Sequence, residues 1–96
     1  MSDRFEVSYH PDVKRIDLPK IDQRNRAMIK KAIEDRLSVQ PELYGRRLQR
    51  TLKDYWKLRV GQYRVVFKIV GTKINVLAII HRKDVYQLVE KRVKTK

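Results

Sequence analysis

Three short runs in the C-terminal half, joined only by glycine-containing connections, constrain the fold more than any other feature. They are residues 55–60 (YWKLRV), 63–70 (YRVVFKIV) and 74–80 (INVLAII), with Gly61 and Gly71 in the connections. The runs are rich in β-branched and aromatic residues, which favour strands. Because the connections are short enough to reverse the chain at once, the pattern predicts a three-stranded antiparallel meander.

The N-terminal half predicts one strand followed by two helices. Residues 4–9 alternate polar and apolar side chains, a period of two that is typical of a strand. Pro11 suits the first turn of a short helix, which Pro19 ends. Asp22 is a typical N-cap residue for a second helix that Pro41 stops. Apolar residues recur on one face of this second helix: Met28, Ile29, Ala32, Ile33 and Leu37.

Together these elements predict an α+β domain with an N-terminal strand, a two-helix hairpin, the three-stranded antiparallel meander and a short C-terminal helix. The C-terminal helix is indicated over residues 83–93, where apolar residues return to helical spacing. We expect the helices on one face of the sheet, the first strand parallel to a later one, and a loop over residues 41–54. A length of 96 residues predicts a single domain, residues 1–96.

Positive charge is the dominant feature of the composition. The chain has 24 Lys and Arg against 11 Asp and Glu, for a formal net charge of +13. Residues 1–49 carry 11 basic and 8 acidic residues, whereas residues 50–96 carry 13 and 3. A surface this basic attracts polyanions. We therefore expect a polyanion-binding surface in the second half of the chain.

Several classes of function are disfavoured by what the sequence lacks. Without cysteine, the chain has no disulfide, thiolate nucleophile or cysteine-based zinc site. His10 and His81 lack the spacing of a metal-binding pair, and no Ser-His-Asp pattern or glycine-rich phosphate loop is visible. We therefore expect no metal and no cofactor. No apolar run approaches the ~20 residues of a membrane span, so we expect a cytoplasmic protein without a membrane partner.

Basic residues alternate with apolar ones along the predicted meander. Lys57 and Arg59 are then about 7 Å apart on the face of their strand that points away from the helices. Arg64 follows the turn at Gly61, so it can approach Arg59 from the paired strand. The end of the last strand adds polar residues that we expect on the same side of the sheet: His81, Arg82, Lys83 and Tyr86.

A solvated sheet face is the simpler interpretation of each cation taken singly. Like charges opposite each other in a sheet are mildly destabilising, so a cluster of them favours a bound polyanion. Tyr86 is explained as well by packing of the C-terminal helix as by a functional site. Some acidic residues are expected on the helix surfaces or at caps: Asp17, Asp22, Glu34 and Asp35.

The segment from Leu43 to Tyr86 resembles the RelE/ParE superfamily of toxins from toxin–antitoxin systems. The similarity lies in YWKLRVGQYRVVF, the second hairpin after it and the ending HRKDVY. Residues 9–37, with the break at Leu18 and Pro19, also fit the opening strand and helical hairpin of the family. The resemblance spans nearly the whole chain. It implies a compact sheet with a two-helix hairpin, encoded beside an antitoxin.

Within this superfamily, RelE-type members cut mRNA in the ribosomal A site, whereas ParE-type members inhibit DNA gyrase. The HRKDVY ending and the dense cations of the sheet are more similar to the RelE type. The resemblance thus implies a metal-independent endoribonuclease that acts by 2′-OH attack and inhibits translation. It implies catalytic roles for Lys57, Arg64, Arg82 and Tyr86. We assign RNA-binding roles to Arg59, Lys68, His81 and Lys83.

The implied partners are a cognate antitoxin, the ribosome with its RNA, and mRNA. We expect a monomeric free toxin and a hetero-oligomer with the antitoxin. The general base stays open between Tyr86 and Lys57, since Tyr55 stands where some family members have a second lysine.

Two other functions stay open. A ParE-like gyrase inhibitor would damage DNA while translation continues. A non-catalytic basic domain would bind nucleic acid or a protein partner with steep salt dependence and would cut nothing on ribosomes.

Overall fold

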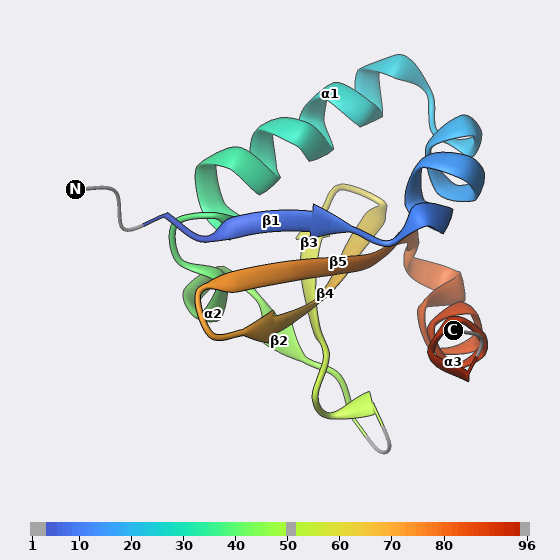
Figure 1. Cartoon of the computed structure of the whole chain (residues 1–96). Helices are drawn as coiled ribbons and strands as arrows, with labels where there is room; N and C mark the ends of the chain where they lie inside the picture. The colour runs from blue at the N-terminus through green and yellow to red at the C-terminus, as the bar shows by residue number, and fades with distance from the viewer. Residues whose placement is uncertain (1–3, 50–51, 95–96) are drawn as a thin grey trace.

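The computed structural model describes residues 4–49 and 52–94 and contains a five-stranded mixed sheet (Figure 1). The strands lie side by side in the order β1-β5-β4-β3-β2. Their bounds are Glu6–Tyr9 for β1, Arg46–Arg47 for β2, Trp56–Val60 for β3, Tyr63–Val70 for β4 and Lys73–His81 for β5.

The predicted antiparallel meander is confirmed as β3, β4 and β5. β4 pairs antiparallel with both of its neighbours. Gly61 and Gly71 lie in the two turns with φ of 60° and 62°, a left-handed conformation that glycine adopts without steric cost. A register shift between Val66 and Phe67 marks an irregularity in the pairing with β5.

The first strand is parallel to the last, as expected. β1 pairs with β5 only from Glu6 opposite Lys73 to Tyr9 opposite Val76. The His10 N–H then donates to the Val76 carbonyl at 2.8 Å, and the chain turns into the helical hairpin. The part of β5 that follows Val76 therefore extends beyond β1.

The helical hairpin covers one face of the sheet (Figure 1). The Asp22 carboxylate accepts a hydrogen bond from the Asn25 N–H at 3.2 Å, which confirms the predicted N-cap. The first arm comprises η1 (Val13–Asp17) and η2 (Leu18–Lys20), and the second comprises α1 (Gln23–Ala32) and its continuation η3 (Ile33–Leu37).

The main core lies between this hairpin and the sheet. Ile29 and Leu37 from the second arm meet Leu58, Val65 and Phe67 from β3 and β4, and none of the five is more than 2 % exposed. The three sheet residues occupy alternate strand positions, so the period of two read in the sequence is what places them on one face.

A second, smaller core lies on the opposite face of the sheet. The C-terminal helix α3 (Val85–Lys94), preceded by η5 (Arg82–Asp84), packs there. The expectation that all helices lie on one face is therefore wrong for α3. The intervening positions of β4 and β5 are also apolar, which gives α3 a surface to bury. The buried members of this core are Leu48, Leu52, Val66, Ala78, Ile80, Val85 and Val89.

The segment expected as a loop, residues 41–54, contains two short elements. These are α2 (Pro41–Tyr44) and β2, which pairs antiparallel with β3. Gly45 joins them at a close approach: a Cβ there would be 2.7 Å from Phe67 Cζ and 2.8 Å from the Pro41 carbonyl oxygen. The position thus has no space for a side chain. Residues 50 and 51 of the expected loop lie outside the described residues.

Candidate functional site

Arg59, Arg64 and Arg82 gather at the end of the sheet that carries the β3–β4 turn, and we call them the arginine cluster. Arg59 and Arg64 are directly opposite each other in the register of β3 and β4. The Arg82 N–H donates to the carbonyl of Gln62, in the turn, at 2.9 Å. The positive charges of Arg59 and Arg82 both act on Arg64. The predicted approach of Arg64 to Arg59 is therefore confirmed.

The guanidinium of Arg64 is held by the backbone of its own turn. Nη1 donates to the Gly61 carbonyl at 3.2 Å and to the Tyr63 carbonyl at 2.8 Å. Desolvation by partial burial, followed by repulsion from Arg59 and Arg82, lowers the pKa of Arg64 from its usual value. Within the described part of the chain, no carboxylate forms an ion pair with the cluster. A bound anion such as a phosphodiester would relieve this repulsion.

Lys57 extends the basic surface along β3. It is half-buried, and its Cα partners are Val66 on β4 and Arg46 on β2. Arg46 is exposed, and it shares the face of Lys57 because residues directly opposite each other in a sheet lie on the same face. The sequence pattern did not indicate Arg46, because a strand of two residues is too short to show a period.

Tyr86 lies on the first turn of α3 at the rim of the second core. Val85 and Val89 of the same helix are 5 % and 0 % exposed in that core, whereas Tyr86 is 36 % exposed. The hydroxyl oxygen of Tyr86 accepts a hydrogen bond from the Gln49 N–H at 3.3 Å. Tyr86 therefore bridges α3 and the segment before β3, on the face of the sheet that carries Lys57.

His81 lies on the other face of the sheet. Its Cα partner is Tyr63, which packs against the main core, and the two rings are in edge contact with centroids 5.9 Å apart. Nδ1 of His81 accepts from the Lys83 N–H at 3.3 Å and so caps η5. The expectation that His81 lies on the same side as Arg64 is wrong, because side chains alternate along β5 and the partner of Arg64 is Ile80.

The two predicted RNA-binding lysines differ in their distance from the cluster. Lys83 is exposed on η5, next to Arg82 in the chain. Lys68 lies near the far end of β4, where its ammonium is 5.7 Å from the ring centroid of Tyr55. Lys68 lines a groove with Ser8 and Asn75, apart from the arginine cluster.

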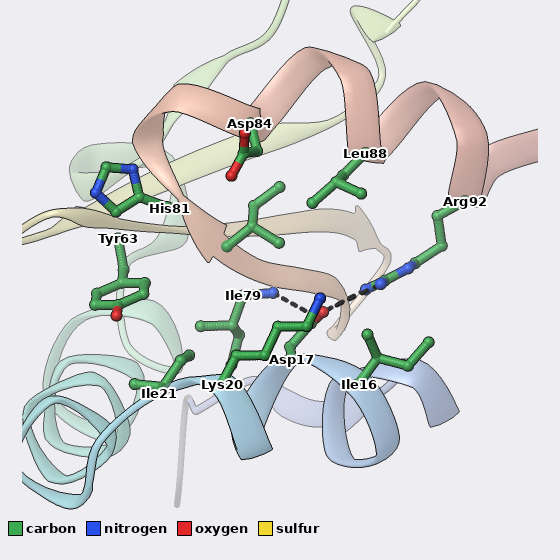
Figure 2. A pocket seen from close by; sticks show the side chains of 11 residues that line it. Ile16, Asp17, Lys20, Ile21, Tyr63, Ile79, His81, Asp84, Leu88 and Arg92 are labelled. Atoms are coloured by element: carbon green, nitrogen blue, oxygen red, sulfur yellow. Dashed lines mark hydrogen bonds and ion pairs between the residues drawn. The ribbon is translucent and has the colours of Figure 1, made fainter.

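A buried ion pair joins the helical hairpin to α3 at the edge of β5 (Figure 2). The Asp17 carboxylate accepts from Arg92 Nη1 at 2.8 Å and Nη2 at 3.1 Å, and from the Ile79 N–H at 2.9 Å. Arg92 Nη1 also donates to the Leu77 carbonyl at 3.1 Å. The side chains of Asp17 and Arg92 are 2 % and 7 % exposed. The expectation of Asp17 on a helix surface is wrong, since its partner lies 75 residues away and no local pattern reveals it.

Two features are absent from the residues that the structure describes. They include no group of three or more His, Cys, Asp or Glu side chains arranged to hold a metal ion. Nor do they include a helix long and apolar enough to cross a membrane.

A family model described as the ParE toxin of the type II toxin-antitoxin system parDE matches residues 7–86, so the chain is a small toxin of the RelE/ParE superfamily. More particularly, it belongs to the ParE toxin family. The match runs from β1 to the first turn of α3. The resemblance inferred from the sequence is thus confirmed, and the chain is a toxin of a type II system.

Solved toxin–antitoxin complexes contain the same fold. The RelBE2 complex of Mycobacterium tuberculosis matches with a TM-score of 0.76 and 28 % identity, over 82 % of this chain and 99 % of that chain. The RelB-RelE antitoxin-toxin complex of Methanococcus jannaschii matches with a TM-score of 0.63 and 22 % identity, over 83 % and 95 % of the two chains. The YoeB-YefM complex of Staphylococcus aureus gives 0.55 and 19 %, over 82 % and 98 %. The predicted RelE-like fold is confirmed. No curated protein sequence matches the chain.

Proposed function

We propose that this toxin is a ribosome-dependent endoribonuclease that cuts mRNA in the ribosomal A site and so inhibits translation. One observation carries the proposal. The arginine cluster, Lys57 and Tyr86 share one face of the sheet, and no described carboxylate pairs with the cluster. Converging cations without acidic partners suit a phosphodiester whose charge grows during the reaction. The match to a RelBE2 complex supports the RelE-type target.

The proposed reaction is attack by a ribose 2′-OH on the adjacent phosphorus. The O2′–P bond forms as the P–O5′ bond breaks, which leaves a 2′,3′-cyclic phosphate and a 5′-OH. A general base removes the proton of the 2′-OH, and a general acid gives a proton to the leaving 5′ oxygen. One proton is taken and one is returned, so the chemistry balances within the RNA and two side chains.

Tyr86 is the proposed general base and Lys57 the proposed general acid. The Gln49 N–H already donates to the Tyr86 hydroxyl oxygen. This donor stabilises the negative charge on the oxygen once its proton has left. This hydrogen bond favours Tyr86 over Lys57 as the general base, a choice that the sequence left open.

Arg64 and Arg82 are the proposed ligands of the non-bridging phosphate oxygens. Arg64 suits this role because two backbone carbonyls hold its guanidinium before any substrate binds. Preorganised charge of this kind needs little rearrangement in the transition state. Arg59, Lys68 and Lys83 are proposed to contact the RNA backbone outside the reacting phosphate.

We also propose that the toxin forms a hetero-oligomer with a cognate antitoxin and is a cytoplasmic monomer when free. The similar RelBE2 and RelB-RelE structures are both described as complexes of toxin and antitoxin. Size-exclusion chromatography with light scattering, on the toxin alone and co-expressed with the protein encoded by the adjacent gene, tests both statements.

Primer extension on a defined mRNA, with purified toxin and with or without programmed ribosomes, tests the activity. The proposal expects cleavage only with ribosomes, inside the A-site codon. Cleavage of naked mRNA at many sites would contradict ribosome dependence. Binding to ribosomes without cleavage would instead identify a non-catalytic basic domain.

DNA gyrase inhibition is the second candidate, because the matching family model is named for the ParE toxin. A supercoiling assay with purified gyrase separates the two candidates. Loss of supercoiling at toxin concentrations that leave translation intact would favour gyrase, and the reverse result would favour the ribosome.

A further inference from the structure

Side chains, rather than a strand, occupy the edge of β5 beyond β1. β1 ends opposite Val76, yet the Leu77 carbonyl and the Ile79 N–H just after it are both hydrogen-bonded. Arg92 supplies the donor and Asp17 the acceptor. Each of the two side chains bonds to one backbone group of β5. The pair therefore fixes the position of α3 along that strand.

Apolar packing alone does not fix α3 against the hairpin. A cavity of about 170 Å³ lies between the hairpin, the end of β5 and α3, and Ile16, Ile79 and Leu88 are among its lining residues (Figure 2). On the sheet side, α3 is buried through Val85 and Val89. Hydrophobic contact is non-directional, so these contacts define the position of the helix along β5 less sharply than a directional ion pair does.

Polar contacts hold α3 near both of its ends. Tyr86 bonds to Gln49 in its first turn, and Arg92 bonds to Asp17 about 9 Å further along the helix axis. The helix is rigid between these points, so a shift at Arg92 is transmitted to Tyr86. The Arg92 Nε atom also lies 3.8 Å from the Asp12 carboxylate, which adds a second acidic contact from the hairpin.

We infer that Asp17 and Arg92 are positioning residues that place the Tyr86 hydroxyl for the reaction. Neither residue touches the RNA; they act by fixing α3 on β5. This inference rests on the proposed function of Tyr86 as the general base. It assigns a use to a buried ion pair at β5, which β4 separates from the strand of Lys57.

The test uses a variant that removes both charges together, Asp17→Leu with Arg92→Leu. Removing one partner alone leaves a buried charge unpaired and threatens folding. Replacing both by Leu leaves no buried charge, although the Ile79 N–H and the Leu77 carbonyl lose their partners. The matched control is Lys31→Gln with Asp35→Asn. It removes an exposed ion pair within the hairpin, in which Lys31 Nζ lies 3.4 Å from Asp35 Oδ2. Cooperative urea unfolding of both variants confirms that they fold.

Single-turnover cleavage at saturating ribosomes gives the first readout. The cleavage rate of the paired Leu variant should be about 10- to 100-fold lower than that of the parent, since a misplacement near 1 Å has effects of this size. The ribosome concentration that gives half-maximal cleavage should stay unchanged. Adding Tyr86→Phe to that variant should cause a smaller loss than Tyr86→Phe causes in the parent, because a misplaced base contributes less. Parental rates in the paired variant, or a full additional loss from Tyr86→Phe, would overturn the inference.

Fluorine NMR of protein labelled with 3-fluorotyrosine gives a readout that does not need activity. The Tyr86 signal is identified by its disappearance in Tyr86→Phe. It should shift or broaden in the paired Leu variant and stay in place in the control variant. An unmoved signal would show that the pair does not position Tyr86. If the parental toxin cuts no mRNA, the proposed function fails, yet this spectrum still decides the structural inference.

Discussion

At the scale of single residues, Arg64 is unusual because its guanidinium is already bound to backbone carbonyls while two other arginines repel it. Replacing Arg64 by Ala should lower single-turnover mRNA cleavage on programmed ribosomes by about 10²- to 10³-fold, the usual effect of removing one preorganised donor. Arg15→Ala, at an exposed position of η1, is the matched control and should cut at the parental rate. Equal rates for Arg64→Ala and the control would remove Arg64 from the proposed site.

The same substitution should leave the fold intact. A lowered pKa means that the folded state binds the Arg64 proton less tightly than the unfolded state does. The charged side chain therefore costs stability at neutral pH, and this cost is relieved only as the pH rises through the folded pKa. Circular dichroism and urea unfolding at neutral pH should accordingly show no destabilisation of Arg64→Ala.

Gly45 matters for the space around it rather than for its backbone angles. Because a Cβ there would meet the buried ring of Phe67 and the Pro41 carbonyl below 3 Å, Gly45→Ala should reduce the free energy of unfolding by about 1–3 kcal/mol. Urea denaturation measures this directly. The control is Gly71→Asn, at a turn position with open space around it and a positive φ that asparagine tolerates. A loss at Gly71 as large as that at Gly45 would contradict the steric explanation.

At the scale of elements, local patterns in the sequence predict most of what the structure contains. The meander follows from β-branched runs and two glycines, and its observed bounds differ from the expected ones by at most one residue at each end. The cap at Asp22 follows from one side chain and its neighbour. These features depend on residues close together in the chain, which is why a single sequence reveals them.

The elements that escaped prediction depend on distant partners. β2 has only two residues and is a strand because it pairs with the open edge of β3. α3 packs on the side of the sheet that carries Val66 and Ala78. The strands of these two residues are long apolar runs, and such a run does not indicate whether one face of the sheet or both are covered by helices. Periodicity within α3 shows that it has an apolar face but not which surface that face will meet.

The attachment of α3 yields a stability prediction of its own. Arg92→Leu alone leaves the Asp17 carboxylate buried without its cation, which should lower the free energy of unfolding by about 3–5 kcal/mol. The paired Leu variant should recover part of this loss in urea denaturation, because it leaves no buried charge unpaired although the Ile79 N–H and the Leu77 carbonyl lose their partners. A single variant that is as stable as the pair would show that water reaches Asp17 and that the ion pair is dispensable.

At the scale of the whole molecule, the net charge of +13 predicts binding that depends steeply on salt. Each cation that contacts a phosphate contributes about 0.7–0.9 to the slope of log K against log salt. Lys83→Gln, next to the arginine cluster, should reduce the slope for ribosome binding by about that amount. The measurement is a titration at a series of potassium chloride concentrations.

Lys30→Gln is the matched control for this slope. Lys30 is an exposed lysine on α1, which covers the opposite face of the sheet. The proposed RNA-binding face predicts that Lys30→Gln leaves the slope unchanged. Equal slopes for both variants would mean that RNA is held by charge spread over the whole surface rather than by one face.

The candidate site was predictable only where neighbouring strands are joined by a short turn. Alternation along β3 and the short turn bring Arg59 and Arg64 together, so those two follow from the sequence. His81 was misplaced because the strand continues in register to that residue before η5 begins. Arg46 and the Asp17–Arg92 pair depend on which surfaces meet in three dimensions, and no spacing in the sequence encodes that.

The long reach of the Asp17 contacts also has a consequence for the order in which the chain folds. Asp17 forms its hydrogen bonds with Ile79, 62 residues later in the chain, and with Arg92, 75 residues later. Contacts between such distant residues form slowly during folding. β1 likewise gains its partner only after β5 has been made. A nascent chain that still lacks α3 has neither Tyr86 nor the guanidinium that anchors the helix. If its target is the ribosome, as proposed, the toxin acquires its harmful shape only after the whole segment from Asp17 to Arg92 has been synthesised.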